Sequence, residues 1–212
     1  NPENPILEED IIEYDNYPLR AGKGSVYEGG IRVPMLIRWP EKINTGHKVE
    51  VPVHVVDIAP TLFNIAGVDC ESLAKEHILD GEDIMPLLKN VNSKDFSDRA
   101  IFQYYPFYDL RWGLTPCATI HKGKYKLIEF FGDRFETNHQ YIPGHRIELY
   151  NLKEDIGETI NLIEIEPDKT QELLSELHAW MEEMTVVASI ENPYYPPDSM
   201  CVETKNKPEW ID

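Results

Sequence analysis

Residues 19–34 combine, in one short stretch, the residue types that an anion-binding loop needs. The stretch reads Leu-Arg-Ala-Gly-Lys-Gly-Ser-Val-Tyr-Glu-Gly-Gly-Ile-Arg-Val-Pro. Lys23 stands between two glycines, so its ammonium group is on an uncrowded loop and suits an anion such as sulfate or phosphate. Glu28 and Arg32 are four residues apart and are spaced to form an ion pair. We expect this pair to support the loop that carries Lys23.

The segments that follow the loop predict two strands and a helix. Val33–Trp39 is apolar and is expected to be a buried strand, and Val49–Val56 is expected to be a second extended stretch. Asp57 is expected to cap a helix over Ile58–Ala66, which would end at Gly67.

The second half of the chain changes to short strands separated by turn residues. Lys122-Gly123 suits a tight hairpin turn, and Asp168 or Thr170 is expected to cap a helix that runs to about Met184. We interpret Asp155, Glu158 and Asn161 as a capped turn rather than a metal site. The predicted strands are Ala100–Tyr105, Ala118–His121, Tyr125–Phe131 and Arg146–Tyr150.

Taken together, these motifs resemble the C-terminal part of the type I, formylglycine-dependent sulfatases. In that family Leu-Arg-x-Gly-Lys-Gly precedes a Tyr/Trp-Glu-Gly-Gly-x-Arg-x-Pro run, and both patterns are present in residues 19–34. The similarity covers about residues 17–185 and includes a Lys-Leu-Ile strand and the run Glu-Leu-Tyr-Asn-Leu that begins at Glu148. By this resemblance Lys23 is the catalytic lysine that contacts the sulfate, and Glu28 and Arg32 are structural support of the site.

The resemblance implies a fold of the α/β class. We expect the end of an alkaline-phosphatase-like mixed sheet, followed by a small C-terminal antiparallel sheet with a packed helix. The expected domains are residues 1–98 for the α/β part, 99–185 for the antiparallel sheet and helix, and 186–212 for an extended tail.

The family also uses a formylglycine nucleophile and a Ca²⁺ ion, and neither is expected to be supplied by this chain. Formylglycine is made from the first residue of Cys/Ser-x-Pro-x-Arg, and the sequence contains no such pattern. The family's Asp-Asn-Gly metal segment is absent as well, and Asp15-Asn16 is interpreted as loop. We therefore expect no metal ligand in this chain, an N-terminal half that supplies both groups, and no sulfatase activity from these 212 residues alone.

Substrate contacts are expected from the segment Gln103-Tyr-Tyr-Pro-Phe-Tyr108. Some relatives, resembling N-acetylgalactosamine sulfatases, have histidines where Tyr104 and Phe107 stand, so no particular sugar is implied. Tyr104, Tyr108 and Arg111 could stack on a sugar ring or form hydrogen bonds with it, and they are the candidate substrate-binding residues. The alternative is that the tyrosines only pack the sheet.

Composition limits the classes of partner. The net charge of −18 disfavours nucleic acid and anionic lipid, and no run approaches the roughly 20 apolar residues of a membrane helix. The cysteines, Cys70, Cys117 and Cys201, have no CxxC spacing and are expected to be free thiols, although one disulfide is possible in an exported protein. Export to a periplasm, lysosome or exterior follows from the resemblance alone.

Three functions remain open at this point. The leading one is hydrolysis of a sulfate ester, of a sulfated sugar or a small aryl or alkyl sulfate, by a protein of which this chain is the C-terminal portion. A related phospho-ester hydrolase of the same superfamily is the enzymatic alternative. A non-catalytic fragment that only binds anionic sugars is the alternative from another class.

Overall fold

The computed structural model describes residues 16–89, 94–108, 115–132, 134–135, 141–142 and 144–187. Contacts divide the chain into two compact units. The first unit joins the residues up to Val33 to those from Phe102 onward, and the second is Pro34–Ile101. The expected domain boundaries after residues 98 and 185 stay predictions.

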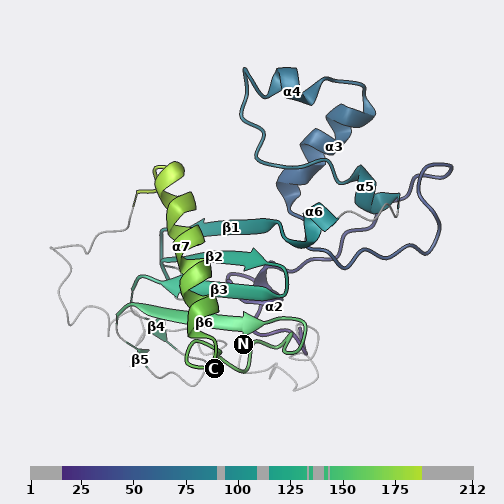
Figure 1. Cartoon of the computed structure of the whole chain (residues 1–212). Helices are drawn as coiled ribbons and strands as arrows, with labels where there is room; N and C mark the ends of the chain where they lie inside the picture. Colours follow the sequence, from purple (N-terminus) through teal and green to yellow (C-terminus); the bar gives the residue numbers. More distant parts are fainter. Residues whose placement is uncertain are drawn as a thin grey trace, which may run out of the picture. The chain divides into compact units, whose positions relative to one another are not determined.

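The first unit is built on a four-stranded sheet with the order β1-β2-β3-β6 (Figure 1). Strands β2 and β3 pair antiparallel around the turn at Gly123, whose φ is +58°, and β3 pairs antiparallel with β6. Two short segments, β4 and β5, form a separate pair. The predicted antiparallel sheet and hairpin are confirmed, with bounds β1 Ala100–Tyr105, β2 Cys117–Lys122, β3 Tyr125–Phe130, β4 Arg134–Phe135, β5 Tyr141–Ile142 and β6 Arg146–Asn151.

Helix α7, Pro167–Glu183, covers one face of this sheet (Figure 1). Its buried residues are Leu173, Leu174 and Leu177, whose spacing places them on one face of the helix. The expectation of a side-chain cap from Asp168 or Thr170 is wrong. The N-cap is Glu166, which makes no capping hydrogen bond, and Pro167 occupies the first turn, where a missing N–H costs nothing.

Polar side chains also join the helix to this face of the sheet. The buried carboxylate of Glu129 on β3 accepts hydrogen bonds from two imidazoles, His178 Nε2 on α7 at 2.6 Å and His145 Nε2 at 2.7 Å. Lys122 at the end of β2 pairs with Glu176 on α7 at 2.7 Å. Because neighbouring residues of a strand point to opposite faces, these contacts fix which residues face the helix.

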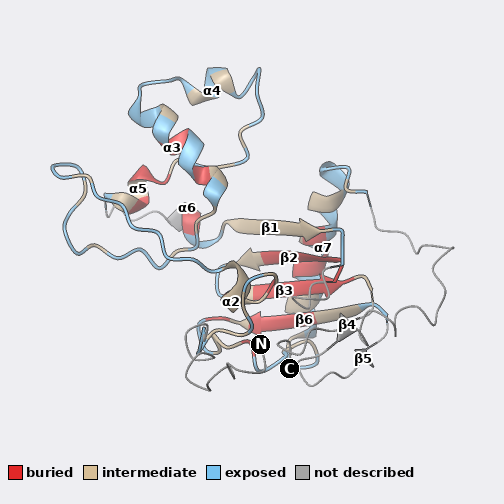
Figure 2. Ribbon diagram, turned by 180° about the vertical axis from the view of Figure 1, so that it is seen from behind, coloured by how far each residue is buried: buried red, intermediate tan, exposed pale blue. Residues whose placement is uncertain are grey.

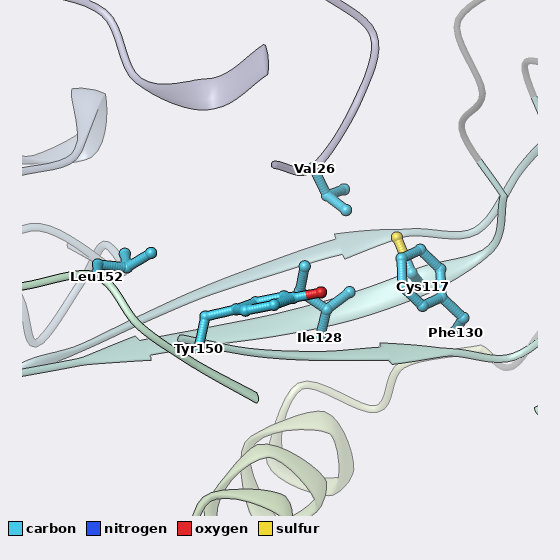
Figure 3. Packing of buried hydrophobic residues seen from close by; sticks show 6 residues of the cluster. All are labelled: Val26, Cys117, Ile128, Phe130, Tyr150 and Leu152. Carbon is cyan, nitrogen blue, oxygen red and sulfur yellow. The ribbon is translucent and has the colours of Figure 1, made fainter. Parts of the chain in front are cut away.

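The other face of the sheet packs against the loop that carries Lys23. Figure 3 shows Val26 of that loop above the strands, over Cys117, Ile128, Phe130 and Tyr150. Burial is deepest in β2, β3 and β6 (Figure 2). The first unit therefore has a sheet with two covered faces, one facing α7 and one facing the lysine loop.

The second unit contains short helices around a small core of Ile84, Leu87 and Phe96. The longest described helix in it is α3, and its residues Ile58, Leu62 and Ile65 are exposed by 41% or more. The helical elements are η2 Val55–Asp57, α3 Ile58–Ile65, α4 Cys70–Leu73, α5 Met85–Leu88 and α6 Lys94–Ser97.

The two strands expected in this region are not formed. Neither Val33–Trp39 nor Val49–Val56 is a strand in the part of the chain that the structure describes. Val33 is 79% exposed and Leu36 is 96% exposed, and no described segment pairs with their backbone. A strand requires a neighbouring strand, and apolar sequence alone does not provide one.

Asp57 is the N-cap residue of α3, as expected, but its side chain does not cap that helix. Its carboxylate makes no hydrogen bond to α3, and instead it lies fully buried against Arg99, with contacts of 2.9 and 2.7 Å to the two guanidinium nitrogens. It further accepts hydrogen bonds from the N–H groups of His54 and Glu82. Asp57 therefore joins three segments of the second unit.

Among the described residues, no helix is long and apolar enough to cross a membrane. Cys70 and Cys117 are free thiols, as expected. Cys201, Asp15, Arg111 and nearly all of the expected tail lie outside the described residues.

Candidate functional site

The lysine loop is shaped by two glycines that follow it. Gly29 and Gly30 lie in α2, the helical turn Glu28–Ile31. A Cβ atom on Gly29 would lie 2.1 Å from the carbonyl oxygen of Ala21, and one on Gly30 would lie 2.3 Å from that of Ser25. The helical turn therefore packs directly on the loop backbone, and only glycine permits this approach.

Hydrogen bonds complete this packing. The N–H of Gly29 donates to the carbonyl of Arg20 at 2.9 Å, and the N–H of Ser25 donates to that of Gly22 at 3.1 Å. The side-chain amide of Asn16 donates to the carbonyls of Gly29 and Ala21, which confirms the interpretation of Asn16 as part of the loop.

Lys23 lies at the outer end of this loop. Its side chain is exposed and has no hydrogen-bond or ion-pair partner among the described residues. The next residue, Gly24, has φ +88°, a left-handed conformation that glycine adopts freely. The loop thus fixes the backbone on both sides of an ammonium group that is available to an anion.

Beneath the loop, α2 is held by a buried cluster of charges. Lys126 on β3 is fully buried, and its Nζ donates to Glu28 Oε1 at 3.0 Å and to Glu158 Oε1 at 2.8 Å. The second oxygen of Glu158 accepts the backbone N–H of Glu28 at 2.7 Å. The predicted ion pair of Glu28 and Arg32 is confirmed, with a distance of 3.6 Å between the charged groups. Because the Arg32 side chain is 56% exposed, water weakens this pair, and the buried contact between Glu28 and Lys126 contributes more to holding α2.

A second set of contacts holds the start of the loop. The guanidinium of Arg20 lies 3.8 Å from the centre of the Tyr27 ring and donates to Tyr150 Oη and to the carbonyl of Glu158, both at 2.9 Å. The hydroxyls of Tyr27 and Tyr150 donate to Glu148, at 2.9 and 2.8 Å. Every one of these side chains comes from the loop or from the segments around β6.

Burial changes the protonation of two groups in this region. It raises the pKa of Glu158 above the usual range of a glutamate, and Lys126 opposes the effect without cancelling it. Burial also lowers the pKa of His121, and the negative charge of Glu28 opposes this decrease only in part. His121 is thus neutral at pH 7.

The candidate substrate-binding residues do not all lie on the same face of the sheet as the lysine loop. Tyr104 on β1 faces α7, since its hydroxyl donates to the carbonyl of Val187 at 2.6 Å just beyond that helix. Its neighbour Tyr105 packs on the opposite face, against the cluster that contains Val26. Tyr108 is 51% exposed with its hydroxyl against Gly132. Substrate binding by Tyr104, Tyr108 and Arg111 stays a prediction.

Sequence reasoning missed Lys126 and Glu158. The sequence of the strand gave one indication of Lys126. It lies two and four residues before Ile128 and Phe130, and every second residue of a strand lies on the same face, here the buried one. The interpretation of a capped turn is confirmed for Asp155 and Asn161, which accept backbone N–H groups, and is wrong for Glu158. No group of three or more His, Cys, Asp or Glu side chains suited to a metal occurs in the described part of the chain.

The residues that form the lysine loop, the sheet and helix α7 fall within one region that matches a known protein family. Residues 21–187 match the family model described as N-sulphoglucosamine sulphohydrolase, C-terminal. The chain belongs to this family of sulfatase C-terminal regions.

Individual relatives agree with the family match. A sulfatase of Formosa agariphila is 32% identical over 183 residues, which cover 79% of this chain and 30% of the relative. Human arylsulfatase A is 31% identical over 169 residues, which cover 75% of this chain and 31% of the relative.

A solved structure shows the same fold. The structure of Ps i-CgsB in complex with k-i-k-neocarrahexaose is similar with a TM-score of 0.62 at 24% identity. The match covers 92% of this chain and 38% of that one. This chain thus spans between 30% and 38% of the length of these three relatives.

Proposed function

We propose that this chain is the C-terminal portion of a sulfatase, and that Lys23 binds the sulfate group during ester hydrolysis. The observation that carries the proposal is the exposed ammonium of Lys23 on a loop fixed by glycine packing, inside the region that matches the sulfatase family. A fixed cation stabilises the negative charge that develops on sulfate oxygens as the ester bond breaks. The same cation also orients the substrate.

The relatives support a proposal for the substrate class. The family model is named for an enzyme of sulphoglucosamine, and the relatives include an arylsulfatase. We therefore propose a sulfated sugar or a small aryl or alkyl sulfate as substrate. The aromatic side chain of Tyr108, half exposed beside Phe107, suits contact with a sugar or aryl ring.

We further propose that the rest of the active site comes from an N-terminal portion of the same protein. The Ca²⁺ ligands and the formylglycine nucleophile that the resemblance implies would be supplied there, and the bound ion would act as a Lewis acid toward the sulfate. Met35, Leu36 and Ile37, each at least 43% exposed, support this proposal, because an apolar run of this kind suits burial against another segment. Export of the protein is proposed from the same resemblance.

The experiment that tests the function compares sulfate and phosphate esters of one aryl alcohol as substrates of the full-length protein. The sulfate ester should be preferred, and Lys23→Ala should lower kcat/KM by about a hundredfold, the effect of removing one charge-stabilising donor. Lys153→Ala, which removes an exposed lysine from the turn after β6, is the matched control and should leave the rate unchanged.

Other outcomes decide between the alternatives. Preference for the phosphate ester would assign the chain to a phospho-ester hydrolase, and binding of sulfated sugar without turnover would assign it to the non-catalytic class. An unchanged rate for Lys23→Ala would remove Lys23 from the mechanism. Turnover by the 212-residue chain alone would contradict the expected need for an N-terminal portion.

A further inference from the structure

We propose that Glu158, acting together with Lys126, is a positioning residue for Lys23. The inference rests on the proposed role of Lys23, and it adds a residue from the turn after β6 to those that support the proposed active site. Glu158 contacts both sides of the lysine loop. Its side chain holds Glu28, which follows the loop, and its backbone carbonyl holds Arg20, which precedes it.

The contact with Glu28 fixes the orientation of α2. The Glu158 carboxylate accepts the Glu28 N–H at 2.7 Å, at the N-terminal end of that helical turn. The Lys126 ammonium lies between the two carboxylates, at 3.0 and 2.8 Å, with no exposure to solvent. Charged groups in such an environment require well-placed partners, so the cluster tolerates little displacement.

The orientation of α2 in turn sets the loop. Gly29 packs on the carbonyls of Arg20 and Ala21, and Gly30 packs on those of Gly22 and Ser25. Gly29 also donates to the carbonyl of Arg20. A shift of the helical turn therefore moves the backbone on which Lys23 stands. Such a shift displaces the ammonium from a bound sulfate, and a misplacement of about 1 Å can cost about a hundredfold in rate.

The backbone at Glu158 is itself constrained for this task. Its φ is +52°, a left-handed conformation that is uncommon for a residue with a side chain. The preceding turn is fixed by Asp155, whose carboxylate accepts the N–H groups of Thr159 and Ile160. Local hydrogen bonds thus hold Glu158 in the conformation in which it reaches both Arg20 and Glu28.

The test is a double-mutant cycle in the full-length sulfatase. Glu158→Ala should lower kcat by about tenfold, and Glu158→Gln, whose single side-chain oxygen can replace only one of the two acceptors, should restore only part of that loss. If Glu158 acts through Lys23, then Lys23→Ala with Glu158→Ala should be no slower than Lys23→Ala alone, within about twofold. Losses that multiply in the double variant would overturn the proposal.

The matched control is Glu176→Ala. It also removes the carboxylate of a lysine–glutamate pair, but its partner Lys122 and helix α7 lie on the opposite face of the sheet. This variant should leave kcat unchanged. A loss equal to that of Glu158→Ala would show a general effect of destabilisation and would overturn the positioning role.

Hydrogen exchange separates this inference from the proposed function. The N–H groups of Ser25 and Gly29, both bonded within the loop, should exchange at least about tenfold faster in Glu158→Ala and at the original rate in Glu176→Ala. Faster exchange in Glu158→Ala, combined with an unchanged rate of hydrolysis in Lys23→Ala, would support the role of Glu158 in positioning the loop and would reject Lys23 as a catalytic residue. Unchanged exchange would overturn the positioning. If Glu158→Ala does not fold, Arg20→Met, which breaks the other contact with Glu158, allows the same measurements.

Discussion

The ring of Phe102 on β1 stacks on the indole of Trp180 on α7, with centroids 4.8 Å apart and planes inclined by 4°. The contact lies on the face of the sheet opposite the lysine loop. It joins the edge strand of the sheet to the C-terminal half of the helix. The stability of this face can therefore be probed apart from the loop.

Trp180→Ala should lower the free energy of unfolding by about 2–4 kcal/mol, since it removes a large aromatic side chain and its stacked partner contact. Urea unfolding followed by circular dichroism would measure the change. Met184→Ala, at an exposed position just past the same helix, should stay within about 0.5 kcal/mol of the original protein. Equal effects from the two variants would contradict the importance of the stack.

Gly29→Ala should destabilise the protein by about 1–3 kcal/mol, because the new methyl group would lie 2.1 Å from a backbone oxygen that cannot rotate away. Thermal unfolding of the purified variant would measure the loss. Gly22→Ala is the matched control within the same loop. Its methyl group would meet only the Asn16 side chain, at 3.3 Å, and should cost less than about 1 kcal/mol. The reverse order of the two variants would contradict the close packing of α2 on the loop.

The pair of Asp57 and Arg99 should make the second unit sensitive to acid. Burial acts to raise the pKa of Asp57, but the hydrogen bonds from Arg99 and from two backbone N–H groups outweigh it and lower that pKa below its ordinary value of 3.8. The unfolded chain therefore binds this proton at a higher pH than the folded chain. The stabilisation is complete above about pH 5 and is lost as the pH falls through the lowered pKa.

Asp57→Asn should accordingly cost about 3 kcal/mol at pH 7, and the difference from the original protein should shrink toward pH 3. Unfolding curves at several pH values would show this. The control is Glu82→Gln, which removes the other partner of Arg99. That carboxylate is 50% exposed, so the variant should cost less than about 1 kcal/mol. A constant difference between pH 7 and pH 3 would contradict the linkage.

The two described thiols should differ in reactivity. Burial raises the pKa of Cys117 to about 12, and its side chain has no exposure to solvent. Cys70 is partly exposed. Iodoacetamide at pH 8 should modify Cys70 in the folded protein and Cys117 only after denaturation, because the thiolate is the reacting form. Peptide mapping by mass spectrometry would identify the modified cysteines. Modification of Cys117 in the folded protein would contradict its burial.

The strands of the first unit could be predicted from the sequence because the residues that define them are close together along the chain. Lys122-Gly123 and the alternation along β2 and β3 define a hairpin whose register places Lys122 opposite Tyr125. The lysine loop was also evident from its glycines. In contrast, Val33–Trp39 resembles a buried strand, but its state depends on a partner strand that no local pattern specifies.

The support of the site could be predicted only in part, for the same reason. The spacing of Glu28 and Arg32 indicated their contact correctly, since four residues is a local distance. The buried partner of Glu28 is Lys126, 98 residues away, and Glu158 is 130 residues away. A single sequence shows that Lys126 lies on a buried face, but not which carboxylates meet it there.

The same distances determine when the lysine loop can form during folding. Arg20 and Glu158 are separated by 138 residues, so the segment that closes the loop is made long after the loop itself. Contacts of high sequence separation are slow to form, because the intervening chain must first be ordered. During synthesis, Lys23 reaches its final conformation only after β3, β6 and the turn at Glu158 have left the ribosome. We therefore expect the lysine loop to be ordered late, although its residues are synthesised before those of the sheet on which it packs.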